Sequence, residues 1–114
     1  MKNESIYLFH IRDACHKIMD YMQGVDEETF MASSMLQDAV IRQISIIGEA
    51  GTHFSSETRA EHPDIPWRKI IGMRNMLIHQ YFGIDLAFVF ITATERIPEL
   101  AEQVELIIAP HGRK

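Results

Sequence analysis

The stretch LQDAVIRQISIIGEA, residues 36–50, carries the clearest helical pattern in the sequence. Its residues Leu36, Val40, Ile44 and Ile47 recur at spacings of three and four, which places them on one face of an α-helix. Two further isoleucines widen this apolar face. We therefore expect a long helix that is buried on more than one side.

This helix is expected to begin near Ser33 or Ser34 and to run to residue 53 or so. Three small residues, Gly48, Ala50 and Gly51, lie near its end. They would let another backbone approach the helix closely. They could equally weaken the helix, since a glycine costs about 1 kcal/mol in a helix interior.

A first helix is expected over residues 5–23, because one apolar stripe runs along it: Leu8, Ile11, Cys15, Ile18 and Met22. Gly24 is a suitable C-terminal stop. Asp26 can cap a short helical turn that reaches Phe30.

A third helix is expected over residues 66–81, with Pro66 in its first turn, Asp64 or a neighbour as its cap and Gly83 after its end. Residues 57–61 are expected to form one short helical turn before it. A fourth helix begins after Asp85, and Pro98 either kinks it or starts a new helix. The apolar stripe of this last region is Leu86, Val89 or Phe90, Ala93, Ile97, Leu100, Val104 and Ile107.

These elements predict an all-α fold, an up-and-down bundle of four or five helices in a single domain over residues 1–114. No segment alternates in the manner of a strand. The seven methionines are expected to fill the core.

The composition is that of a soluble globular protein, with 46% apolar and 24% charged residues. The N-terminal segment MKNESIYLFH lacks the apolar core of a signal peptide, and no run approaches the roughly 18 apolar residues of a membrane span. The single cysteine, Cys15, excludes an internal disulfide and fits a reducing cytoplasm.

The net charge of −5 argues against a protein that coats nucleic acid by bulk electrostatics. The charge is unevenly spread, however, because residues 65–84 contain no acid. Arg68, Lys69 and Arg74 give this segment +3, which leaves −8 on the rest of the chain. A basic segment on an acidic body suggests a local anion site. The alternative is chance, since three cations in these twenty residues is near average, and the absence of acids is the more informative observation.

Metal and nucleotide sites are not expected. No two of the six histidines are spaced i, i+4, and the cysteine has no cysteine partner. Neither a P-loop nor a glycine-rich dinucleotide fingerprint is present.

The segment MRNMLIHQYFG, residues 73–83, sets four polar side chains among apolar ones: Arg74, Asn75, His79 and Tyr81. Burying such groups without partners costs several kcal/mol each. Arg74 and Tyr81 are seven residues apart and share a helix face, whereas Arg74 and His79 are separated by about 140°. If these two act together, either the helix loosens or the site is shared by two copies across a two-fold axis.

Such a set suits metal-free RNA cleavage. The 2′-hydroxyl would attack the adjacent phosphate, His79 would handle a proton, and Arg74 would stabilise the charge on phosphorus. Asn75 could hold an oxygen or orient the imidazole. On spacing alone, an arginine and a histidine near a helix end more often have a structural role. Elsewhere, Glu49 and Arg42 share a helix face, where they could line the seam between two copies but more simply form a salt bridge.

The pattern R-x-x-x-x-H-x-Y, from Arg74 through His79 to Tyr81, resembles the signature of the HepT-like toxins in the HEPN superfamily. The segments LQDAVIRQISIIGEA, HPDIPWRKIIGMRNMLIHQYFGID and IPEL also look like that family and occur in the same order. The resemblance covers essentially the whole chain.

The resemblance implies a helical homodimer in which the motifs of both chains meet at the interface. It implies Arg74 and His79 as catalytic residues of a metal-independent endoribonuclease, with Asn75 in support. It also implies a partner, a minimal MNT-type nucleotidyltransferase antitoxin that transfers AMP from ATP onto Tyr81. No cofactor is implied for this chain. The alternative is a non-catalytic HEPN protein that binds its nucleotidyltransferase and serves as the modification substrate.

Overall fold

The structure is a computed structural model that describes residues 4–74 and 83–112. The first half of the chain forms α1 (Ser5–Tyr21), α2 (Glu27–Met31), α3 (Ser34–Gly51), α4 (Ser56–Glu61) and α5 (Trp67–Gly72). The second half forms α7 (Leu86–Ile91), the π-helical segment η2 (Thr92–Arg96) and α8 (Ile97–Gly112). Every regular element of this described part is helical, which confirms the predicted fold class.

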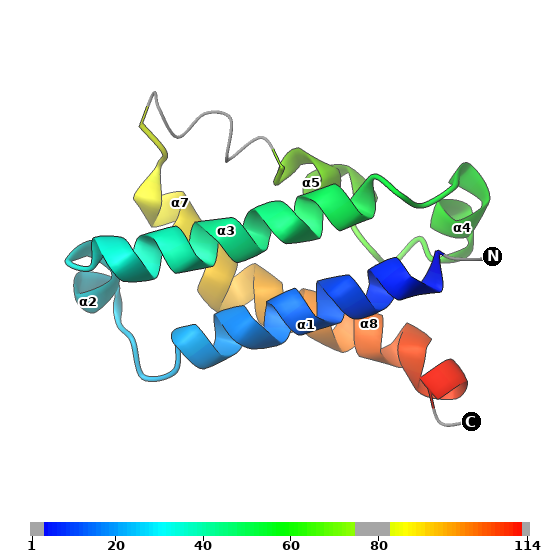
Figure 1. Cartoon of the computed structure of the whole chain (residues 1–114), viewed down its shortest axis with the longest axis horizontal. Helices are drawn as coiled ribbons and strands as arrows, with labels where there is room; N and C mark the ends of the chain where they lie inside the picture. The colour runs from blue at the N-terminus through cyan, green and yellow to red at the C-terminus, as the bar shows by residue number, and fades with distance from the viewer. Residues whose placement is uncertain (1–3, 75–82, 113–114) are drawn as a thin grey trace.

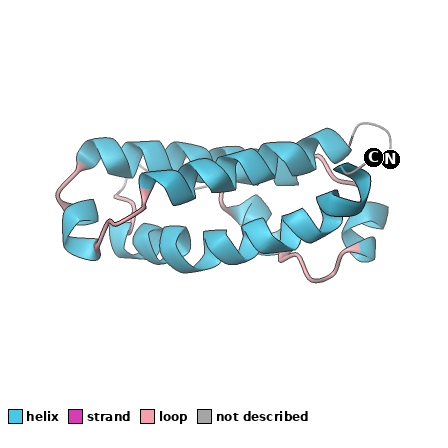
Figure 2. Ribbon diagram, turned by 90° about the horizontal axis from the view of Figure 1, so that it is seen from below, coloured by secondary structure: helices cyan, strands magenta, loops and turns pink. Residues whose placement is uncertain are grey.

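The long helices run up and down along the bundle. In Figure 1, α1 and α3 lie side by side in opposite directions, and the successive segments α7, η2 and α8 run in the same direction as α3. Both α3 and α8 pack on α1, while the short α5 packs on α3. Figure 2 shows the same long helices from below, with the loops gathered at the two ends. The start of α1 and the end of α8 therefore lie at the same end of the bundle.

The helix starts follow the sequence signals closely. The carboxylate of Asp26 accepts a hydrogen bond from the backbone N–H of Thr29 at 2.8 Å. The Ser33 hydroxyl accepts one from Leu36, and the Asp85 carboxylate accepts one from Phe88. All three caps confirm the predictions, because these side chains satisfy amides that have no partner inside the helix.

The predicted Asp64 cap is wrong. Pro66 itself occupies the position before α5, and no side chain caps that helix. The start of α5 is fixed instead by Trp67, whose indole N–H donates to the carbonyls of Arg59 and His62 at 3.2 and 3.0 Å. A tryptophan with a bonded N–H can be half-buried at little cost. Trp67 thus anchors α5 to α4 as well as packing.

One helix end differs from the predicted one, and the position of Pro98 agrees with one of the two predicted alternatives. The first helix ends at Tyr21, and a turn leads to Gly24, whose φ of 72° is readily adopted only by glycine. In the last region, α8 begins at Ile97, so Pro98 lies in its first turn and starts a new helix. Because proline lacks an N–H, the backbone before it widens into η2, and the Ile97 amide bonds the Thr92 carbonyl five residues back.

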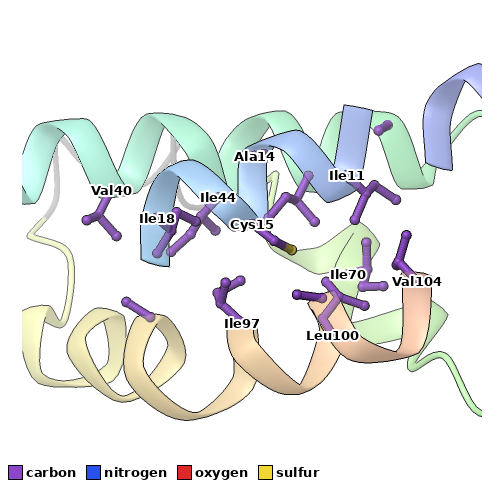
Figure 3. Close-up of a cluster of buried hydrophobic side chains, with 14 of the residues drawn as sticks. Ile11, Ala14, Cys15, Ile18, Val40, Ile44, Ile70, Ile97, Leu100 and Val104 are labelled. Carbon is purple, nitrogen blue, oxygen red and sulfur yellow. The ribbon is translucent and has the colours of Figure 1, made fainter. Parts of the chain in front are cut away.

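The core is built by aliphatic side chains from α1, α3, α5 and α8. Figure 3 shows side chains of α1, α3 and α8, among them Cys15, Ile44 and Ile97, in the space between the helices. The predicted stripe of α1 is buried throughout. Burial raises the pKa of the Cys15 thiol to about 12, so this cysteine is an inert core residue.

The methionine prediction is wrong for most of the described residues of that type. Met22 is buried, but Met19, Met31 and Met35 are exposed, Met35 by 80%. The β-branched side chains of α3 already fill the space between the helices. Within residues 4–74 and 83–112, no helix is both long and apolar enough to cross a membrane.

Candidate functional site

Arg74 is the predicted site residue that the structure describes; Asn75, His79 and Tyr81 lie outside the described residues. The predicted helix over residues 66–81 is not continuous as far as Arg74, because α5 ends at Gly72; the rest of that range, from residue 75 on, lies outside the described residues. Met73 and Arg74 then form a tight turn, in which their amides bond the carbonyls three residues back, Ile70 and Ile71, at 3.0 and 3.2 Å. Glycine is a poor helix former, which fits an end at this position. The predicted rotation of about 140° between Arg74 and His79 concerns residues 75–79, which lie outside the described residues.

The backbone of Arg74 lies directly against α3 at Gly48. A Cβ atom built on Gly48 would stand 2.3 Å from the backbone nitrogen of Arg74. One turn further along α3, a Cβ on Gly51 would stand 2.7 Å from Cγ2 of Ile70. The predicted close approach at the small residues is confirmed, and it is what brings the motif arginine onto α3.

The side chain of Arg74 meets the residue that follows Gly48. Its Nη2 atom lies 3.4 Å from Oε1 of Glu49, and the two side chains are 48% and 58% exposed. The other carboxylate oxygen of Glu49 lies 3.5 Å from Nε2 of His53, one turn along α3. Glu49 thus pairs with Arg74 and His53, and the predicted pair with Arg42 is not among the ion pairs of the described part.

The row of side chains continues onto α1. The ring of His53 stacks on Tyr7 with centroids 4.3 Å apart and planes 5° from parallel. Tyr7 in turn meets the edge of His10 at 5.5 Å. Arg74, Glu49, His53, Tyr7 and His10 therefore form one connected surface row that crosses from the turn after α5 to α1.

Sequence reasoning did not link His53 or Tyr7 to the site. The spacing of Glu49 and His53, four residues apart on a helix, was a signal for their contact. No comparable signal joins either of them to Arg74 or Tyr7, because those contacts cross between helices.

A groove of about 710 Å³ opens on the other side of α5. Ile70, Met73 and Phe88 supply apolar walls, and the lining holds both basic residues, Lys69 and Arg96, and acidic ones. Charges of both signs give this groove no clear preference for an anion. Among the residues that the structure describes, no three His, Cys, Asp or Glu side chains gather in a way that could hold a metal ion.

Comparison with known proteins identifies a family whose model matches most of this chain. The family model "Ribonuclease HepT-like" matches residues 11–107. A candidate RNase of Caldanaerobacter subterraneus subsp. tengcongensis is 38% identical over 108 residues, which cover 95% of this chain and 96% of that protein. A protein of Thermococcus cleftensis named "Probable ribonuclease HepT" is 38% identical over 99 residues, covering 87% of this chain and 90% of its own. A candidate RNase of Methanocaldococcus jannaschii is 33% identical over 101 residues, covering 89% of this chain and 93% of its own. No solved structure gives a significant match.

Proposed function

We propose, because this chain belongs to the Ribonuclease HepT-like family, that it is an endoribonuclease and the toxin of a toxin–antitoxin pair. The observation that carries the proposal is the placement of Arg74. Its backbone docks on Gly48, and its guanidinium stands half-exposed at the surface beside Glu49. A cation held at a surface in this way can meet an RNA phosphate without first being extracted from the core.

Arg74 and His79 would divide the chemistry. The RNA 2′-oxygen attacks phosphorus and the bond to the 5′-oxygen breaks, which leaves a 2′,3′-cyclic phosphate and a 5′-hydroxyl. His79 would carry the proton between these oxygens, and Arg74 would stabilise the charge that develops on the phosphoryl oxygens. Asn75 would hold an oxygen or orient the imidazole.

The complete site would form in a two-fold homodimer, in which Arg74 of one chain acts with His79 of the other. The acidic body of the chain supports this arrangement, since a net charge of −5 cannot attract RNA in bulk. A seam between two copies would bring two basic segments together, which doubles the local positive charge.

The first test is RNA cleavage by the purified protein in EDTA. We expect cleavage without added metal and fragments that end in 2′,3′-cyclic phosphate. A preparation of His79→Ala made in parallel controls for contaminating ribonucleases. Cleavage that needs Mg²⁺, or that the His79→Ala preparation reproduces, would contradict the proposal. Binding to a nucleotidyltransferase with no cleavage at all would favour the non-catalytic alternative.

Tyr81 would be the point of control. A minimal nucleotidyltransferase partner, working with Mg²⁺ and ATP, would transfer AMP to the phenol oxygen with release of pyrophosphate. Each AMP adds a negative charge and bulk beside Arg74 and His79, which should repel RNA.

Intact mass spectrometry after incubation with the partner and ATP tests this modification. We expect the mass to rise in AMP-sized steps for the wild type and to stay unchanged for Tyr81→Phe, while Tyr7→Phe is modified like the wild type. Modification of Tyr81→Phe to the same extent as the wild type would place the acceptor elsewhere.

A further inference from the structure

We propose that Glu49 is a positioning residue that holds the guanidinium of Arg74 in its working orientation. The inference rests on the proposed function, because it assigns a role in RNA cleavage through Arg74. It concerns a residue of α3. This helix lies outside the motif formed by Arg74, Asn75, His79 and Tyr81.

The carboxylate of Glu49 is held from both sides. Oε1 lies 3.4 Å from Nη2 of Arg74, and Oε2 lies 3.5 Å from Nε2 of His53. A single exposed ion pair fixes its partners poorly, because two long side chains must give up their rotamer freedom for a weak attraction. A carboxylate that contacts two partners at once has fewer accessible orientations, so it positions each partner better than a single ion pair does.

The far partner is itself fixed. His53 lies flat on the ring of Tyr7 from α1, at 4.3 Å between centroids. Stacking of this kind favours one plane for the imidazole ring, and the imidazole in turn favours one position for the Glu49 carboxylate. The placement of Arg74 thus depends on a chain of contacts that reaches the neighbouring helix α1.

Two neighbouring residues of α3 hold the backbone and the side chain of Arg74. Gly48 meets the backbone nitrogen of Arg74, and Glu49 meets its guanidinium. These two contacts fix the position of the Arg74 backbone and the position of its guanidinium group. Such a two-point attachment is what a group needs if it is to meet a developing charge without reorganisation.

The contact does not preclude phosphate binding. A guanidinium has five N–H donors in a planar fork, and a contact through one nitrogen does not exhaust them. Glu49 can therefore orient the fork while other N–H groups meet phosphoryl oxygens. A carboxylate next to a phosphate does not help RNA to bind, so its contribution should appear in kcat and not in KM.

Kinetics of the full-length protein on a defined RNA test this split. For Glu49→Gln, which keeps the shape and removes the charge, we expect kcat to fall about tenfold while KM does not rise. Glu49→Asp should recover part of kcat because it restores the charge. Asp38→Asn, which removes one charge from an exposed position of the same helix, should behave as the wild type. An unchanged or increased kcat in Glu49→Gln would overturn the inference, because it would make Glu49 neutral or inhibitory.

A second readout does not need cleavage. In ¹⁵N-labelled protein, the Arg74 Nε–H signal should shift in Glu49→Gln and stay in place in Asp38→Asn. If the wild type fails to cleave RNA, the proposed function fails, while this shift still supports the hold of Glu49 on Arg74. An Arg74 signal that ignores Glu49→Gln would overturn the inference whether or not the protein is a nuclease.

Discussion

Arg74→Ala is expected to lower kcat/KM for RNA cleavage by about 100- to 1,000-fold, the usual loss when one donor to a developing oxyanion is removed, or about 2.7–4 kcal/mol of transition-state stabilisation. The fold should survive this change. Arg74 is half-exposed, and its ion pair with Glu49 is a surface pair, worth about 1 kcal/mol or less. Initial rates on a short RNA, with unfolding curves for both proteins, measure the two effects separately.

Arg12→Ala is the matched control. Arg12 also pairs with a neighbouring carboxylate at the surface, at 3.1 Å from Asp13, but it lies on α1 outside the motif. We expect this variant to keep its cleavage rate. Equal losses in Arg12→Ala and Arg74→Ala would mean that general positive charge, and not the motif arginine, drives the reaction.

Mixing two inactive variants tests whether the site is shared between chains. If Arg74 of one chain works with His79 of its partner, a mixed dimer of Arg74→Ala and His79→Ala contains one intact site. Random mixing should then restore cleavage at up to about one quarter of the wild-type sites. No recovery after confirmed exchange of subunits would place both residues of a site in one chain.

The fold could be predicted because its main signals are local. Apolar spacing along α1 and α3 identified the buried faces, and Asp26, Ser33 and Asp85 identified helix starts. Each of these features depends on residues within one or two turns of one another. The failed cap at Asp64 shows the limit, because the start of α5 is set by the Trp67 indole reaching back to α4.

The candidate site was predicted only in part, because its contacts cross between helices. The motif named Arg74, but nothing along the chain shows that its side chain meets Glu49, or that His53 meets Tyr7. Periodicity was also misleading at the motif, since one continuous helix was expected where α5 ends at Gly72. The small residues of α3 gave the one long-range signal. They allowed two interpretations, the close approach of another backbone or a weakened helix, and did not say which backbone would come close.

The close approach of the Arg74 backbone to α3 at Gly48 leads to the second prediction of a large effect, on stability. Gly48→Ala is expected to lower the free energy of unfolding by about 1–3 kcal/mol, the usual cost of overpacking a well-packed contact. Helix propensity works in the opposite direction, because alanine is favoured over glycine by about 1 kcal/mol. Packing should prevail, since the added Cβ would stand 2.3 Å from the backbone nitrogen of Arg74. A backbone atom held in a turn cannot move aside as the end of a flexible side chain can.

Urea unfolding of three glycine variants measures this effect under matched conditions. A Cβ on Gly72 would meet no atom of the described residues within 4 Å, so Gly72→Ala should raise the free energy of unfolding by about 0.4–1 kcal/mol. Gly51→Ala presses on the side chain of Ile70 and not on Arg74, so it should lose stability but retain more cleavage than Gly48→Ala. A Gly48→Ala protein as stable as Gly72→Ala would show that α3 and the motif turn are not in close contact. Loss of both stability and cleavage at Gly48, with loss of stability alone at Gly51, would show that α3 helps to place Arg74 for the reaction.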